Sequence, residues 1–163
     1  MGCLLFLFYQ DLRYRAVYWL IFPVLLALLV GVTLGESLGR EILISSSLNL
    51  AFLMLQLMLL TIYFSMKNKK WVNITKDYLG WGDILFLLTV AFFLSPMNYL
   101  FFYIGSLSLV LLFTLATIGN NNKHRIPLAG LQSLLFAALL LIDWNLSSLN
   151  LQSDEWLLKQ FGL

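Results

Sequence analysis

Charged residues, cysteine and histidine are all scarce in this sequence. Only 11% of its 163 residues are charged and 61% are hydrophobic, and the mean hydropathy is +0.88. This composition excludes a soluble globular domain, in which about 25% of residues are charged. The single cysteine, Cys3, rules out an internal disulfide and a thiolate zinc cluster, and the single histidine, His124, comes with no second ligand candidate. We therefore expect neither a metal nor a cofactor.

Apolar segments follow one another from residue 1 to residue 144, which predicts one membrane domain over residues 1–144. A helix that crosses a hydrocarbon core of about 30 Å needs about 20 apolar residues. Four segments meet or approach that length, and two shorter ones each carry an aspartate at one end. The long segments are Ala16 to Gly35, Ile42 to Ser65, Met97 to Gly119 and Ile126 to Trp144, and the short ones are Met1 to Tyr9 and Ile84 to Leu94.

Two prolines mark where apolar helices should begin. Ser95-Pro96 is typical of an N-cap residue followed by the first residue of a helix. Pro127 opens the last apolar segment, where its missing N–H is harmless because first-turn N–H groups have no partner within the helix.

The basic residues predict that all six segments cross the membrane. Alternate loops carry 8 of the 10 lysines and arginines, which leaves only Arg40 and Lys159 for the other side. The positive-inside rule places the richer set of loops in the cytoplasm. The alternation holds only if the two short segments also cross, and it then places Asp11 and Asp83 on the cytoplasmic side. The sequence predicts an all-α, polytopic protein of the cell inner membrane with six membrane helices, two of them short.

The tail, residues 145–163, has a different character. Polar residues become frequent after Trp144, and Ser153-Asp154-Glu155-Trp156 has the pattern of a capped helix start. Apolar side chains at helical spacing follow it. We expect an interfacial amphipathic helix on the outer face of the membrane.

Asp11 and Asp83 are the candidate catalytic residues. An ionisable residue at a membrane segment is costly and usually faces a cavity or a partner. At 1.5 Å per residue, Ile84 to Leu94 spans about 16 Å and the residues before Asp11 about 15 Å, so we expect both carboxylates at a similar depth in one hydrated pocket. Such a pair shares a proton and can activate water for peptide hydrolysis. Gly80 and Gly82 would leave room for a substrate backbone.

Each aspartate also has a simpler explanation. An aspartate just before an apolar run is an ordinary N-cap, so Asp83 could do no more than cap the helix that follows. Asp11 stands among arginines and could be a solvated charge beside the membrane. The sequence alone leaves these alternatives open.

The order of these features resembles the type IV prepilin peptidases and the archaeal preflagellin peptidases, which are six-span intramembrane aspartyl proteases. In that family a short first helix ends in an aspartate followed by basic residues, as in YQDLRYRAVYW. A Gly-x-Gly-Asp motif opens the fourth span, as in GWGDILFLL, and Ile-Pro leads the sixth, as in HRIPLAGLQSLLFAALL. The resemblance implies that Asp11 and Asp83 are the catalytic pair and that Gly80, Gly82 and Pro127 are supporting motif residues.

The resemblance also implies a substrate, a pilin-like precursor with a short basic leader and an apolar helix, cleaved at the cytoplasmic face. Bacterial members often carry a cysteine-rich insertion after the first span, associated with a methyltransferase. Here the loop is only Asp11 to Arg15, which implies a peptidase without that activity. The chain departs from the family at Arg15-Ala16-Val17, where Ile-Pro-Asn is common, and at Leu85, where lysine is frequent.

The sequence also predicts further partners and allows alternative functions. We expect contact with membrane lipid and no nucleic-acid partner. Besides the peptidase, three readings remain open at this stage: a catalytically silent homologue, a structural or assembly subunit, and a proton-coupled carrier. The carrier is disfavoured because the chain is small and shows no repeated halves.

Overall fold

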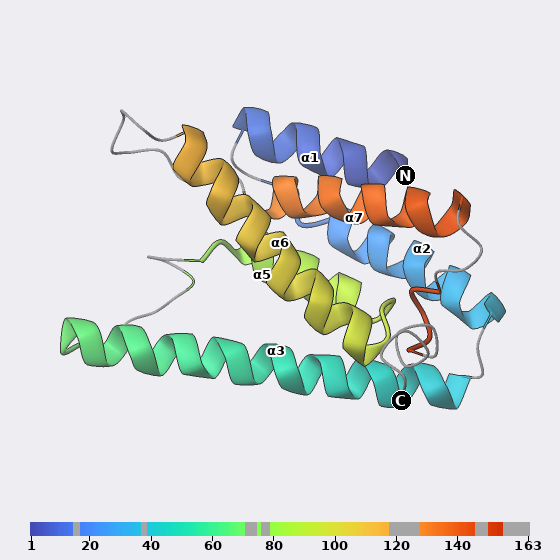
Figure 1. Ribbon diagram of the computed structural model, residues 1–163, viewed down its shortest axis with the longest axis horizontal. Coiled ribbons are helices and arrows are strands. Elements are labelled where there is room, and N and C mark those ends of the chain that lie inside the picture. Colours follow the sequence, from blue (N-terminus) through green and yellow to red (C-terminus); the bar gives the residue numbers. More distant parts are fainter. Residues whose placement is uncertain are drawn as a thin grey trace.

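The protein is a bundle of helices, as a computed structural model shows (Figure 1). The structure describes residues 1–14, 17–36, 39–70, 75, 79–117, 128–145 and 150–154. Within these ranges it contains six helices and no strand, which confirms the all-α class. The helices are α1 (Gly2–Tyr14), α2 (Ile21–Glu36), α3 (Gly39–Asn68), α5 (Trp81–Ala91), α6 (Pro96–Thr117) and α7 (Leu128–Asn145).

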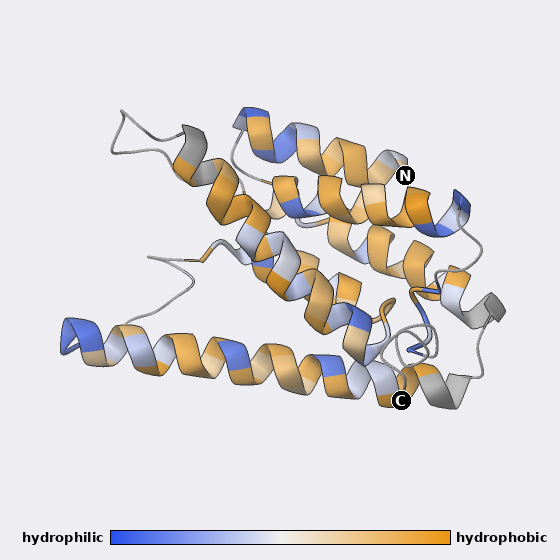
Figure 2. Cartoon of the chain, viewed as in Figure 1, coloured by the Kyte–Doolittle hydropathy of each residue, from blue (hydrophilic) through white to orange (hydrophobic). Residues whose placement is uncertain are grey.

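Three helices are long and apolar enough to cross a membrane. They are the Ile42–Asn68 part of α3, the Pro96–Phe113 part of α6, and α7. Large apolar side chains along them are exposed on the protein surface, among them Leu43, Met58 and Leu112. Figure 2 shows hydrophobic residues along most of every helix and a strongly hydrophilic stretch at one end of α3. An apolar exterior of this kind is what a bilayer requires. The six-span topology stays a prediction.

The expected helix from Ala16 to Gly35 begins later than predicted. Residues 17–20 are not helical, and α2 starts at Ile21. The physical reason is Pro23. A proline is tolerated in the first turn of a helix, but further inside it its ring meets the carbonyl of the residue four positions earlier. A helix starting at position 16 would place Pro23 in its interior, whereas α2, which begins at Ile21, has Pro23 in its first turn.

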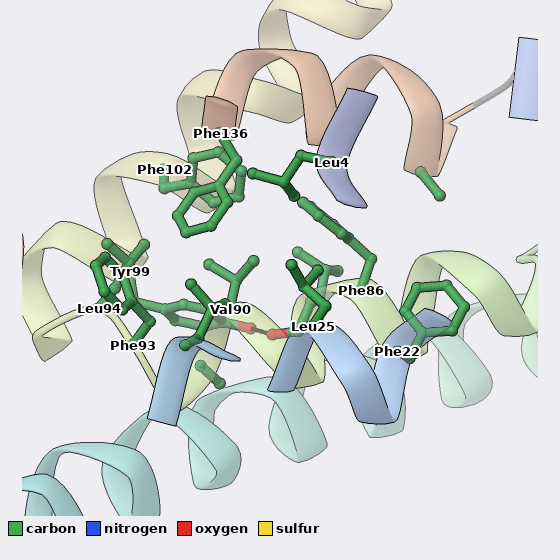
Figure 3. Packing of buried hydrophobic residues seen from close by; sticks show 14 of the residues in the cluster. Leu4, Phe22, Leu25, Phe86, Val90, Phe93, Leu94, Tyr99, Phe102 and Phe136 are labelled. Carbon is green, nitrogen blue, oxygen red and sulfur yellow. Dashed lines mark hydrogen bonds between the residues drawn. The ribbon is translucent and has the colours of Figure 1, made fainter. Parts of the chain in front are cut away.

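The short helix α5 lies at the centre of the bundle. It contacts α2, α3 and α7, and five of its residues are buried: Phe86, Leu87, Thr89, Val90 and Ala91. The core around it is rich in aromatic rings (Figure 3). The ring of Phe136 on α7 has its centroid 6.2 Å from that of Phe86, 5.9 Å from Phe93 and 5.5 Å from Phe102. These are favourable edge-on contacts, and they hold α5, α6 and α7 together.

Asn49 of α3 donates hydrogen bonds to backbone carbonyls at the C-terminal end of α5. It is buried, and its Nδ2 donates to the carbonyl of Ala91 at 2.9 Å and to that of Leu94 at 2.7 Å. The last carbonyls of a helix have no partner within the helix and must find one elsewhere. A polar side chain of a neighbouring helix therefore fixes where α5 stops.

Replacing Asn49 with leucine is expected to lower the free energy of unfolding in detergent by about 1–3 kcal/mol, because two buried carbonyls lose their donor. The matched control is Asn145→Leu. Asn145 is exposed, and within the described residues its amide donates to the Leu141 carbonyl of its own helix, so little change is expected. Equal unfolding free energies for the two variants would contradict the capping role of Asn49.

Residues 150–154 pack against the turn between α5 and α6. Ser95 Oγ donates to Asp154 Oδ1 at 2.6 Å, and the amide of Asn98 donates to the carbonyl of Leu151 at 3.1 Å. Ser153 and Asp154, where the capped start of the interfacial helix is expected, are not assigned to a helix, and the Asp154 carboxylate is the acceptor of the Ser95 bond. The remainder of that expected helix, residues 155–163, lies outside the described residues. The predicted start of α6 at Pro96, preceded by Ser95, is confirmed.

Candidate functional site

Asp11 lies in the last turn but one of α1 and is only 8% exposed. Its Oδ2 accepts a hydrogen bond of 2.6 Å from the backbone N–H of Gly130 in α7. Arg13 is turned to other partners, because it donates to the Tyr9 hydroxyl and lies over the Tyr14 ring. The simpler expectation for Asp11, a solvated charge among arginines, is therefore wrong: the carboxylate is buried between two helices.

Asp83 lies in the first turn of α5 and is half-buried. The helix begins at Trp81 with Gly80 as N-cap, three residues before the predicted start at Ile84. The Asp83 carboxylate reaches back to accept the Gly80 N–H at 3.1 Å. This satisfies the N–H of the N-cap residue, which has no partner within the helix, and explains the earlier start. The capping explanation is thus correct in kind, although Asp83 caps from inside the helix.

The two aspartates meet at the start of α7. The backbone N–H of Ala129 and the carboxylate of Asp11 both lie close enough to the Asp83 carboxylate to influence it electrostatically. Ala129 and Gly130 are consecutive residues in the first turn of α7. N–H groups there lack helical partners and carry the positive end of the helix dipole, so they attract negative groups. Two carboxylates from α1 and α5 therefore lie beside one helix start, and the hydrated pocket expected around the pair stays a prediction.

Gly130 is a site residue that the sequence analysis did not single out. A Cβ on Gly130 would lie 2.9 Å from the Asp11 Cβ and 3.0 Å from its Oδ2. Nothing larger than glycine fits between α7 and Asp11 without moving one of them. The available signal was a glycine in the first turn of an apolar helix, where a residue of higher helix propensity would be expected.

The two motif glycines have different surroundings. A Cβ on Gly80 would lie 3.1 Å from Asp83 Oδ2, so this position is tight because of the Asp83 carboxylate itself. A Cβ on Gly82 would make ordinary contacts of 3.8 Å with Phe22 and Val17. Pro127, the third supporting residue expected, lies outside the described residues.

Ser133 connects the site to α1. It is fully buried, and its Oγ lies 2.7 Å from the carbonyl of Gly130 and 3.3 Å from the carbonyl of Leu4, positioned to donate to either. A small residue one turn after Gly130 also lets α1 and α7 approach closely, as Figure 1 shows for these two neighbouring helices. The position of Asp11 is thus set by close packing of two helices.

The reactive groups of this site are the carboxyl groups of Asp11 and Asp83, which can act as acid and base. In the described part of the chain, no three residues among histidine, cysteine, aspartate and glutamate gather in a way that could hold a metal ion. Two close carboxylates ionise at different pH values, so one can hold a proton while the other acts as a base. Comparison of the chain with family models, with curated proteins and with solved structures gave no match, so the assignment of this site rests on its own geometry.

Proposed function

We propose that this protein is an intramembrane aspartic endopeptidase that removes the short basic leader of pilin-like precursors at the cytoplasmic face of the cell inner membrane. One observation carries the proposal. Asp11 and Asp83, from helices far apart in the sequence, lie beside the same first turn of α7, where Asp11 accepts the Gly130 N–H. A pair of acids gathered in this way, in a protein with an apolar exterior, is suited to hydrolysis of a peptide bond at a membrane.

The proposed reaction uses the pair as acid and base. One carboxylate takes a proton from water while the water oxygen bonds to the scissile carbonyl carbon, and the protonated carboxyl gives its proton to the carbonyl oxygen. The tetrahedral gem-diol then collapses: the carboxyl that took a proton from water gives it to the leaving nitrogen as the C–N bond breaks, and one gem-diol hydroxyl returns a proton to the other carboxylate, which restores the pair. The backbone N–H groups of Gly130 and Gly80 hold the carboxyl groups of Asp11 and Asp83 in place, so little reorganisation is needed during the reaction. Which aspartate holds the shared proton is a property of the pair.

The distribution of charge supports the cytoplasmic location. Lys67 lies in the last turn of α3 and Arg13 in that of α1. Figure 1 shows these two helix ends at the same end of the molecule as the start of α7. The site and the basic residues therefore share one end of the bundle, and by the positive-inside rule this is the cytoplasmic end.

The same contacts favour a second candidate, a catalytically silent subunit. Each carboxylate accepts backbone N–H groups at a helix start, which is also what a purely structural cap does. In this reading the two acids serve only to join α1, α5 and α7.

The experiment that decides is cleavage of a model precursor, a basic leader fused to an apolar helix, by the purified native protein in lipid. We expect release of the leader, with mass spectrometry locating the cut between leader and helix. A second precursor with the leader's basic residues replaced by glutamine tests whether the leader is recognised. A folded native protein that cleaves none of several leaders would remove the peptidase and favour the silent subunit.

A further inference from the structure

An apolar groove lies between the first half of α6 and the second half of α7. Its volume is about 470 Å³, and almost all of its lining is apolar. Phe101 and Leu109 line it from α6, and Ala138 and Ile142 line it from α7. All four side chains are exposed on the protein surface, so the groove opens toward the lipid. Figure 1 shows the start of α6 and the end of α7 at the same end of the molecule, which is the end of α7 opposite to the aspartate pair.

The length of the groove matches the depth of one leaflet. Its lining extends along α6 from Asn98 to Leu109 and along α7 from Leu135 to Asp143, which at 1.5 Å per residue is about 16 Å and about 12 Å. One leaflet contributes about 15 Å, half of a hydrocarbon core of about 30 Å. A transmembrane partner helix would follow the bundle through the whole core. A groove that ends halfway is suited to a single acyl chain of a membrane lipid.

Asp143 gives the groove one acidic end. It is half-buried, and its Oδ1 accepts the backbone N–H of Leu151 at 3.2 Å. A carboxylate has about four acceptor positions, so it can accept further donors besides this one. The next residue, Trp144, is 84% exposed, and exposed tryptophans are typical of the depth of the lipid headgroups. Asp143 therefore lies where the headgroup of a lipid in the groove would be.

The charge at this end selects among headgroups. No lysine or arginine is among the described residues that line the groove, so Asp143 alone sets its sign. An ammonium group can donate charge-assisted hydrogen bonds to a carboxylate. The choline headgroup has no N–H to donate, and an anionic glycerol headgroup would be repelled.

We propose that this groove binds one phospholipid with an ethanolamine headgroup. One acyl chain lies between α6 and α7, and the ammonium group donates to the Asp143 carboxylate. The site is at the other end of α7 from Asp11 and Asp83, so the proposal does not depend on the peptidase function.

Lipid retention tests the acyl-chain part. The protein is reconstituted into vesicles with equal amounts of ethanolamine, choline and glycerol phospholipids of identical chains, extracted in detergent, and examined by native mass spectrometry. We expect one retained ethanolamine phospholipid per native chain. Ala138→Leu fills the groove and should lower the retained fraction at least about fivefold. Ala51→Leu is the matched control, since Ala51 is exposed on α3, outside the groove. Native retention in Ala138→Leu overturns the proposal.

Asp143→Asn tests the headgroup part. Asparagine keeps an oxygen for the Leu151 N–H and removes the charge, so the fold should be kept, as melting curves can verify. We expect the preference for ethanolamine over choline to fall about fivefold, the size of one charge interaction near a membrane surface. Asp154→Asn is the control, because Asp154 lies near the same end and does not line the groove. An unchanged preference in Asp143→Asn overturns the proposal.

The native protein alone can also contradict the proposal. Equal retention of the three headgroups would show that Asp143 selects none of them. A lipid-free dimer that becomes a monomer in Ala138→Leu would show that a second copy of the chain covers the groove. Either result overturns the proposal.

Discussion

Protein carrying Asp11→Asn or Asp83→Asn is expected to cleave the model precursor at least about 10³-fold more slowly than the native protein. General acid–base groups typically contribute 10²- to 10⁴-fold to a rate, and each aspartate serves as acid or base in both steps of the proposed reaction. An asparagine can neither share a proton nor take one from water. The measurement is the initial rate of leader release in lipid, compared at equal amounts of folded protein.

Asparagine keeps the shape of the side chain and an oxygen that can accept the N–H of Gly130, so both variants should fold. Their melting curves serve as a check. Asp154→Asn is the matched control, because Asp154 bonds Ser95 at the N-terminal end of α6, away from the pair. We expect it to keep the native rate. If Asp11→Asn or Asp83→Asn cleaves at the native rate, that aspartate has no part in the chemistry.

Gly130→Ala is expected to lower the free energy of unfolding by about 1–3 kcal/mol, the usual cost of overpacking. The new Cβ would lie 2.9 Å from the Asp11 Cβ. Both atoms are attached directly to helix backbones, so a change of rotamer cannot relieve the contact and α1 must move from α7. The Asp11 carboxylate moves with α1. A displacement of about 1 Å can cost 10²-fold in rate, so we expect cleavage to fall by a similar factor.

Gly105→Ala provides the control for this substitution. Gly105 is in α6, and a Cβ there would have no atom within 4 Å. Alanine also has a higher helix propensity than glycine, so stability should be unchanged or slightly increased. Unfolding in detergent and leader release are measured for both variants. Native stability and native rate in Gly130→Ala would show that close packing of α1 on α7 is not what positions Asp11.

The helices could be predicted where their boundaries depend on residues close together in the sequence. Apolar length predicted the helices now seen as α3, α6 and α7, and Ser95-Pro96 predicted the first residue of α6. These features depend on the chain's own composition and on the special geometry of proline. The start of α2 was missed because Pro23 was not used, although it limits how early that helix can begin. The start of α5 was missed because the Asp83 carboxylate satisfies the N–H of the N-cap residue from three residues further along.

The candidate site was predictable only in part. Asp11 and Asp83 stand out in the sequence because a charge beside a long apolar run is unusual, and their order resembles a known family. Gly130 and Ser133 carry a weaker signal, since small residues are frequent wherever membrane helices pack closely. Their importance arises from what lies opposite them: the Asp11 side chain and the Leu4 carbonyl of α1.

Composition and segment length determine that this chain forms apolar helices. The free energy of placing a segment in lipid depends mainly on the side chains of that segment itself. The tertiary structure decides which helix ends meet. The start of α7 has N–H groups without helical partners, and the Gly130 N–H finds its partner on another helix, in the carboxylate of Asp11. That pairing depends on distances between segments far apart in the chain, which no local pattern encodes.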